Sequence, residues 1–290
     1  MTPIIACHLG AGKQKKDEKY KRLLINALKI NTTCTAIDIV ENCIKVLEQS
    51  GIVNCGYGAV NRECDALIIG KQFGSVCCTT SKHPISMARY LMESKRVVDG
   101  LMVPLMVSGD AYFKKIGVYD EREKNTSTDL FMGDTVGCIA YSNNELSVGT
   151  SSGGIIRKEP GRIGSSALFG VGGFIKEVGS KSVAITSSGA GEQILLTDFC
   201  RTTVNALLIT RDTLKTLNEC ITAFIDHPLL KDYMYKHIGV LIIISDTDNQ
   251  EILYAHTTPT FFIGTIINGK ISCHFSKLSN KLYSIGLLSA

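Results

Sequence analysis

Gly133-Asp134-Thr135-Val136-Gly137 decides how this chain is interpreted, because it places a threonine at the head of an apolar run with the pattern of a buried strand. The polar segment 119–128 (YDEREKNTST) lies just upstream and has no apolar periodicity. Cleavage of the backbone before Thr135 would free an α-amine with a pKa of roughly 7.7–8.0, a suitable base for the neighbouring hydroxyl at neutral pH. By itself the pattern is also typical of an ordinary threonine that begins a strand, so the rest of the chain must decide.

The composition indicates a folded protein without an obvious metal or nucleic-acid partner. The 290 residues allow one large domain or two small ones, and 44% of them are apolar, enough to build a full core. The net charge of +4 is short of the basic balance of a dedicated nucleic-acid-binding protein. The six histidines lack ligand spacing and the eleven cysteines form no Cys-x-x-Cys, so we expect no metal site and no cofactor.

The cysteines and the N-terminus indicate an intracellular protein. Most cysteines lie inside apolar runs, as small buried thiols do, and we expect a reducing compartment, either cytoplasm or nucleus. The first twelve residues are broken by glycines and are soon followed by a charged segment, unlike a signal peptide. No apolar run reaches the length needed to span a membrane. We therefore expect no membrane partner.

Apolar periodicity predicts helices and strands in a mixed order. Helices are expected over 17–30, from Thr35 to just before Gly51, from Pro84 onward, and over 192–208 and 211–225. Strands are expected over 3–7, 66–69, 75–79, 136–141, 146–150, 183–187, 240–244, 252–256, 261–265 and 271–275. Consecutive hairpins with paired helices favour sheets covered by helices over a doubly wound parallel sheet.

Gly149-Thr150-Ser151-Ser152-Gly153 matches the G-x-S-x-G elbow of one hydrolase class, but that elbow must enter a helix directly. Pro160 and Gly161 lie where the helix should be, so we reject the elbow. At the end of a hairpin strand, Ser151 and Ser152 could instead present hydroxyls to a neighbouring strand head.

Two further segments could bind anionic groups. Gly189-Ala190-Gly191 precedes an expected helix and could let backbone N–H groups approach an oxyanion, although a plain tight turn is an equal alternative. Arg162, in Pro160-Gly161-Arg162-Ile163-Gly164, could bind a carboxylate through two hydrogen bonds. An isolated arginine is more commonly a solvated surface group, and no acid lies near Arg162 in the sequence.

Together these segments resemble the threonine N-terminal-nucleophile hydrolases of the isoaspartyl peptidase/asparaginase family. The resemblance implies an α+β fold, a four-layer αββα sandwich in which helices cover two antiparallel sheets, over a single domain 1–290. It also implies self-cleavage between Asp134 and Thr135 into an α chain (1–134) and a β chain (135–290), paired as a homodimer of such heterodimers. The matching segments follow the family's order: His8-Leu9-Gly10-Ala11-Gly12, Asn54-Cys55-Gly56-Tyr57-Gly58, Cys64-Asp65-Ala66, Gly133-Asp134-Thr135-Val136-Gly137, Ser151-Ser152-Gly153-Gly154, Pro160-Gly161-Arg162-Ile163-Gly164 and Thr186-Ser187-Ser188-Gly189-Ala190-Gly191-Glu192.

Within that family the chain looks most similar to the threonine aspartase branch, which cleaves proteins after aspartate. Asparaginases typically carry an acid that holds the α-ammonium of the substrate, and Ser165 takes its position here. A buried cation needs a paired charge, so a site without that acid suits an internal peptide bond. Asp134 precedes Thr135, and segments 256–258 and 274–278 resemble the end of that branch. The branch implies a threonine endopeptidase acting on protein substrates with an internal aspartate.

The resemblance also implies catalytic roles. Thr135 would be the nucleophile, with its freed amine as the general base, and Ser152 would hydrogen-bond to it. Asn54, together with Ser188 or the N–H of Gly189, would form the oxyanion hole.

Substrate binding would fall to a second group of residues. Arg162 would bind the aspartate carboxylate beside Ser165, and Gly191 would line the pocket. One alternative keeps this machinery but hydrolyses asparagine or β-aspartyl dipeptides. Another is an uncleaved, non-catalytic family member that acts as a binding module.

Overall fold

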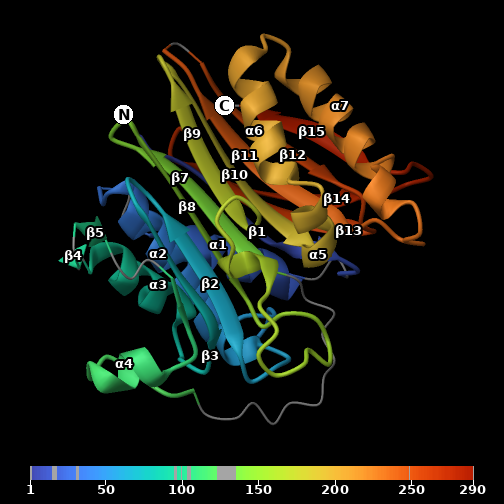
Figure 1. Cartoon of the computed structure of the whole chain (residues 1–290). Coiled ribbons are helices and arrows are strands. Elements are labelled where there is room, and N and C mark those ends of the chain that lie inside the picture. Colours follow the sequence, from blue (N-terminus) through green and yellow to red (C-terminus); the bar gives the residue numbers. More distant parts are fainter. Residues whose placement is uncertain are drawn as a thin grey trace.

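Two β-sheets packed face to face form the centre of the molecule, with helices on both outer sides (Figure 1). The computed structural model describes residues 2–14, 18–30, 33–94, 97–98, 100–102, 106–122, 135–247 and 249–289. Gly133 and Asp134, and with them one side of the expected cleavage site, lie outside these residues.

Besides the short pair of β4 and β5, the described ranges hold a larger sheet of eight strands in the order β14-β13-β1-β7-β8-β2-β3-β6 and a smaller one of five in the order β15-β12-β11-β10-β9. Neighbouring strands in both are antiparallel except β3 and β6, which pair in parallel. The strands are β1 (Ile4–Gly12), β2 (Cys64–Ile69), β3 (Phe73–Thr79), β4 (Val97–Val98), β5 (Leu101–Met102), β6 (Met106–Ser108), β7 (Val136–Ser142), β8 (Glu145–Ser152), β9 (Gly173–Val178), β10 (Lys181–Gly189), β11 (Ile238–Ser245), β12 (Gln250–His256), β13 (Thr260–Ile267), β14 (Lys270–Lys277) and β15 (Ser284–Ser289).

The central strands are apolar on both faces because each face is covered. In β1, Ile4 and Ala6 face the other sheet, whereas Ile5 and Cys7 face the helices. Successive side chains of a strand point to opposite faces, so a strand buried on both sides becomes a continuous apolar run. One apolar layer therefore lies between the sheets, and another lies beneath each helical layer.

The helices divide between the two outer faces (Figure 1). α1 (Glu18–Leu28), α2 (Ala36–Gln49) and α3 (Pro84–Glu93) pack on the larger sheet, and α6 (Phe199–Ile209) and α7 (Thr213–Ile225) pack on the smaller one. α4 (Ala111–Lys115) and α5 (Gly191–Leu196) are short. The expected start of α2 is confirmed, because the Thr35 side chain accepts a hydrogen bond from the N–H of Asp38.

The α+β, four-layer arrangement predicted from the sequence is confirmed. The single helix expected over 192–208 is wrong: it is divided into α5 and α6 at Asp198, whose φ of +46° is left-handed and ends the first helix. The edge strands β9 and β15 were not expected, because polar residues and glycine interrupt their apolar pattern.

All eleven cysteines are free thiols. In the part of the chain that the structure describes, no helix is both long and apolar enough to cross a bilayer.

Candidate active site

Thr135 stands at the end of the central strand β7, beside the end of β8. Val136 pairs with Ser151 in the antiparallel register, which puts Thr135 next to Ser152. Thr135 is buried, with 7% of the residue exposed. On its other side, β7 pairs with the N-terminal strand β1, so β7 lies between β8 and β1.

A cavity of about 200 Å³ opens at this strand end. It brings together seven of the eight described residues predicted for the site, which lie between positions 54 and 191 of the sequence. The lining residues are Asn54, Thr135, Ser152, Gly154, Ile155, Ile156, Arg162, Gly164, Ser165, Ser166, Gly189 and Gly191.

Ser188 is the predicted residue that does not line this cavity. It is fully buried, and its hydroxyl accepts a hydrogen bond from the N–H of Ala11 on β1 (3.0 Å). Of the two partners considered for Asn54 in an oxyanion hole, the geometry therefore favours Gly189. The catalytic role of Ser188 stays a prediction.

The backbone at Gly189 requires glycine. Its φ is +131°, and a Cβ atom built there would lie 2.3 Å from the carbonyl oxygen of His237. Gly191 also lies close to a neighbour, because the Oγ of Ser165 would be 2.9 Å from an added Cβ. The wall formed by Gly189 and Gly191 is thus made of backbone, which leaves room for a substrate.

Asn54 is fixed by hydrogen bonds to Val60 and to the loop after β8. Its Oδ1 accepts the N–H of Val60 (3.0 Å), and its Nδ2 donates to the carbonyl of Gly154 (2.7 Å). The amide nitrogen carries a second hydrogen, which could bind a developing oxyanion. Both contacts hold the carboxamide at the cavity wall.

The two serines at the end of β8 have different environments. The Ser152 hydroxyl accepts the N–H of Gly154 (3.0 Å), lines the cavity and keeps its own proton for another acceptor. Ser151 faces the helices instead, where it donates to Glu48 Oε1 (2.7 Å). The expectation that Ser151 presents its hydroxyl beside the nucleophile is therefore wrong, because successive side chains in a strand point to opposite faces.

Glu48 is a buried acid that the sequence did not reveal. Its Oε1 also accepts the N–H of Ile85, and its Oε2 lies 3.6 Å from the ring of His83. Burial raises the pKa of this carboxyl above its ordinary value. Glu48 thus joins α2 to β8 and to α3 beneath the site.

Arg162 is not an isolated surface group. Its guanidinium lines the cavity with 18% of the side chain exposed, and Nε and Nη2 both donate to Glu192 Oε1, at 2.8 and 2.5 Å. Glu192 lies in the first turn of α5 and is 57% exposed. Among the described lining residues, Arg162 is the charged one. It can therefore bind an anionic substrate group.

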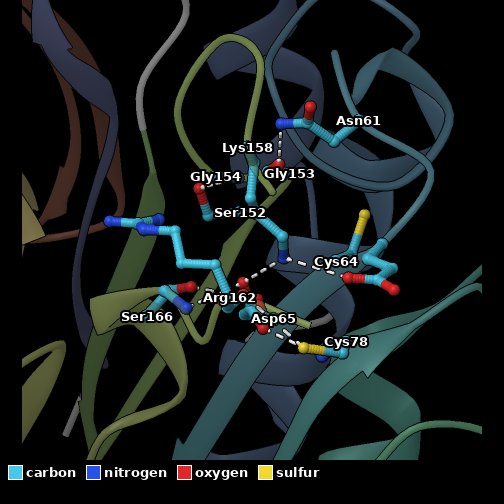
Figure 2. Close-up of polar contacts among 12 residues, drawn as sticks. Asn61, Cys64, Asp65, Cys78, Ser152, Gly153, Gly154, Lys158, Arg162 and Ser166 are labelled. Atoms are coloured by element: carbon cyan, nitrogen blue, oxygen red, sulfur yellow. Dashed lines mark hydrogen bonds and ion pairs between the residues drawn. The ribbon is translucent and has the colours of Figure 1, made fainter. Parts of the chain in front are cut away.

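Asp65 and Lys158 form a buried ion pair behind the Arg162 loop (Figure 2). The Lys158 Nζ is 3.0 Å from Asp65 Oδ2, and the two side chains are 1% and 0% exposed. Asp65 belongs to one of the segments that carry the family resemblance, although the resemblance alone implies no role for it. Its partner lies 93 positions away in the sequence, so no local pattern could have revealed the pair.

The described residues that line this cavity include polar groups but no imidazole. No histidine occurs among its described lining residues, and no group of three metal-binding side chains occurs in the described parts of the chain. His8 faces Gly137 in the strand register, but burial lowers its pKa to about 3, which keeps the ring neutral.

Comparison with known proteins gives consistent matches. The sequence model of the family described as asparaginase matches residues 107–250, which include Thr135, Ser152, Arg162 and Gly189. A plant-type L-asparaginase of Pyrococcus horikoshii is 30% identical over 268 residues, 77% of this chain and 85% of that protein. Isoaspartyl peptidase/L-asparaginases of Bos taurus and Xenopus laevis are 25% and 28% identical; the matches cover 89% and 67% of this chain and 92% and 72% of those proteins.

Proposed function

Because this chain belongs to the asparaginase family of N-terminal nucleophile hydrolases, we propose that Thr135 becomes its N-terminal nucleophile after self-cleavage of the 134–135 bond. The position of Thr135 at a strand end within the cavity supports this role. The processed enzyme would consist of an α chain (1–134) and a β chain (135–290). Its pairing into a dimer of such heterodimers and its intracellular location stay predictions.

The proposed reaction is transfer of an acyl group to Thr135 and then to water. The free amine takes the proton of Thr135 Oγ, the oxygen bonds to the substrate carbonyl carbon, and the amide C–N bond breaks as the leaving amine accepts that proton. Water then hydrolyses the ester. Asn54 and the backbone at Gly189 would stabilise the oxyanion, where loss of one donor costs about 3 kcal/mol. Ser152 would hydrogen-bond to the nucleophile.

We further propose that the substrate is an internal peptide bond after aspartate, with the aspartate carboxylate on Arg162. The observation that carries this proposal is the lining of the cavity. Arg162 can bind an anion in this cavity. No aspartate or glutamate occurs among the described lining residues, and Ser165 takes the place where an acid would hold an α-ammonium. An internal peptide has no such cation to pair.

Hydrolysis of asparagine or β-aspartyl dipeptides is the second candidate, because the relatives are named as L-asparaginases and isoaspartyl peptidases. Assay of one β-aspartyl dipeptide beside one peptide with an internal Asp-Gly bond separates the two. We expect turnover of the internal peptide. Turnover of the dipeptide alone would show that the interpretation of Ser165 is wrong.

Ser165→Asp sharpens this test by restoring a carboxylate to the cavity. We expect kcat/KM for the β-aspartyl dipeptide to rise by about tenfold relative to that for the internal peptide, because the new charge can pair with the substrate ammonium. Ser165→Asn is the matched control, since it has the same size without the charge. Equal effects of both substitutions would remove the argument from charge.

A non-catalytic binding module remains the third candidate. It predicts a single uncut chain in denaturing electrophoresis after long incubation of the purified protein. The hydroxyl, amide and guanidinium groups that meet in the cavity favour the enzyme instead.

A further inference from the structure

The loop that presents Arg162 needs external support. It covers residues 153–164, between β8 and the 3-10 turn η2 (Ser165–Ala167), and contains four glycines. A glycine-rich backbone has many conformations of similar energy, so its own sequence does not fix where Arg162 points. Contacts from other elements must select the conformation that turns the guanidinium into the cavity.

Asp65, at the start of β2, supplies these contacts on both sides of Arg162. Its Oδ2 accepts Lys158 Nζ and the N–H of Gly164, each at 3.0 Å. Its Oδ1 accepts the N–H of Cys78 (2.9 Å) on β3, which fixes the plane of the carboxylate. One carboxyl group therefore fastens positions 158 and 164 of the loop to the larger sheet.

Glu63 adds a more exposed contact to the same turn. Its Oε2 accepts the N–H of Gly161 (2.8 Å) and lies 4.0 Å from Lys158 Nζ. Figure 2 shows Lys158 directed toward Asp65, whereas the Arg162 side chain leaves the loop on the side of Ser152. Lys158, which anchors the turn, and Arg162, which faces the cavity, thus point in different directions from the same turn.

The chemistry of the pair suits positioning better than stability. A buried ion pair is often no more stabilising than apolar residues of the same volume, because both charges lose their hydration. A carboxylate, however, can accept several hydrogen bonds in fixed directions, and here three donors converge on it. An apolar pair could fill the space but could not hold the N–H of Gly164.

We propose that Asp65 and Lys158 are positioning residues of the carboxylate subsite, which hold the 158–164 turn so that Arg162 faces the substrate anion. This inference rests on the proposed role of Arg162 in substrate binding.

Calorimetric titration of the mature protein with N-acetyl-L-aspartate tests the inference by measuring that subsite directly. The main variant is Asp65→Asn with Lys158→Met, which removes both charges together and leaves no unpaired ion in the interior. Glu63→Ala tests the same turn from a half-buried position. Arg162→Ala is the reference for loss of the subsite, and Glu145→Ala, which removes an exposed partner of Lys71, is the matched control.

We expect the double variant to bind about tenfold more weakly or worse, because a charge-assisted contact on each side of Arg162 is lost. Glu63→Ala should weaken binding by a smaller factor, and Glu145→Ala should bind like the wild type. In turnover of the substrate, the double variant should raise KM more than it lowers kcat. A merely structural role would reduce the active fraction and leave KM and the dissociation constant unchanged.

A double variant that is folded by thermal melting and binds with the wild-type dissociation constant overturns the inference. If the double variant does not fold, Glu63→Ala decides in the same way. If Arg162→Ala binds as well as the wild type, the proposed function loses its carboxylate subsite and the inference fails with it. Loss of binding in Arg162→Ala alone contradicts the inference and leaves the proposed function standing.

Discussion

Arg162 in the cavity forms an ion pair with Glu192, and this pair determines the local charge around a bound substrate. Glu192 takes the Nε edge of the guanidinium, and Nη1 lies toward Gly154, where an added Cβ would be 3.6 Å from it. A carboxylate can bind the remaining edge through two hydrogen bonds. It does so, however, beside the negative charge of Glu192, so the pair fixes the orientation of Arg162 and weakens its attraction for anions.

Glu192→Gln should therefore improve binding of an acidic substrate. The amide oxygen of glutamine can still accept from Nε and Nη2, while the negative charge is removed. We expect KM for the aspartate-containing peptide to fall by about two- to fivefold, a modest factor because the pair is partly exposed to solvent. Steady-state kinetics measures the effect, with Glu219→Gln on α7 as the control for an exposed glutamate. A rise in KM would mean that the charge of Glu192 helps to bind the substrate.

At the scale of elements, the site lies where the ends of two central strands meet a glycine-rich loop and a short helix. β7 and β8 supply Thr135 and Ser152, and the turn into α5 supplies the backbone wall at 189–191. The helical layer supports this arrangement from behind, because Glu48 of α2 accepts hydrogen bonds from Ser151 on β8 and from Ile85 on α3.

Glu48→Gln should reveal this support through the pH dependence of stability. Burial raises the pKa of Glu48, so the folded protein holds the proton more tightly than the unfolded chain. The stability from this group is fully present below the ordinary pKa of a glutamate and is lost as pH rises through the raised pKa. Glutamine stays neutral, so the melting temperature of the variant relative to the wild type should rise as the pH increases above the ordinary pKa of a glutamate. A difference that stays constant over this range would contradict the account of Glu48.

The sequence predicts those parts of the site that local chemistry dictates. Thr135, Ser152 and the glycines at 189 and 191 stand at strand ends and turns, where residue type and position carry the signal. Glu192 and Lys158 were missed because their partners lie 30 and 93 positions away, and such pairs form only when the sheets assemble. The ranges predicted for β8 and β10, which are buried on both faces, are too short at both ends, because polar residues there interrupt the apolar pattern.

Across the whole molecule, cleavage before Thr135 would leave two chains whose strands alternate in one sheet. β1, β2, β3 and β6 precede the cleavage point, whereas β7, β8, β13 and β14 follow it. β1 lies between β13 and β7, and β8 pairs with β2. Separation of the chains would expose unpaired backbone groups and the apolar core at once.

The two chains should therefore stay together after cleavage. We expect them to elute as one species in native size-exclusion chromatography and to separate only in denaturant. Separation of the two chains in native buffer would contradict the strand order described here.

N-terminal sequencing of the mature protein tests the central claim most directly. The account predicts a sequence beginning Thr-Val-Gly, from Thr135, in addition to the original N-terminus, and it predicts that Thr135→Ala remains uncut. A mature protein that hydrolyses peptides while its chain is unbroken at this position would contradict the claim, because the base proposed for Thr135 would then not exist.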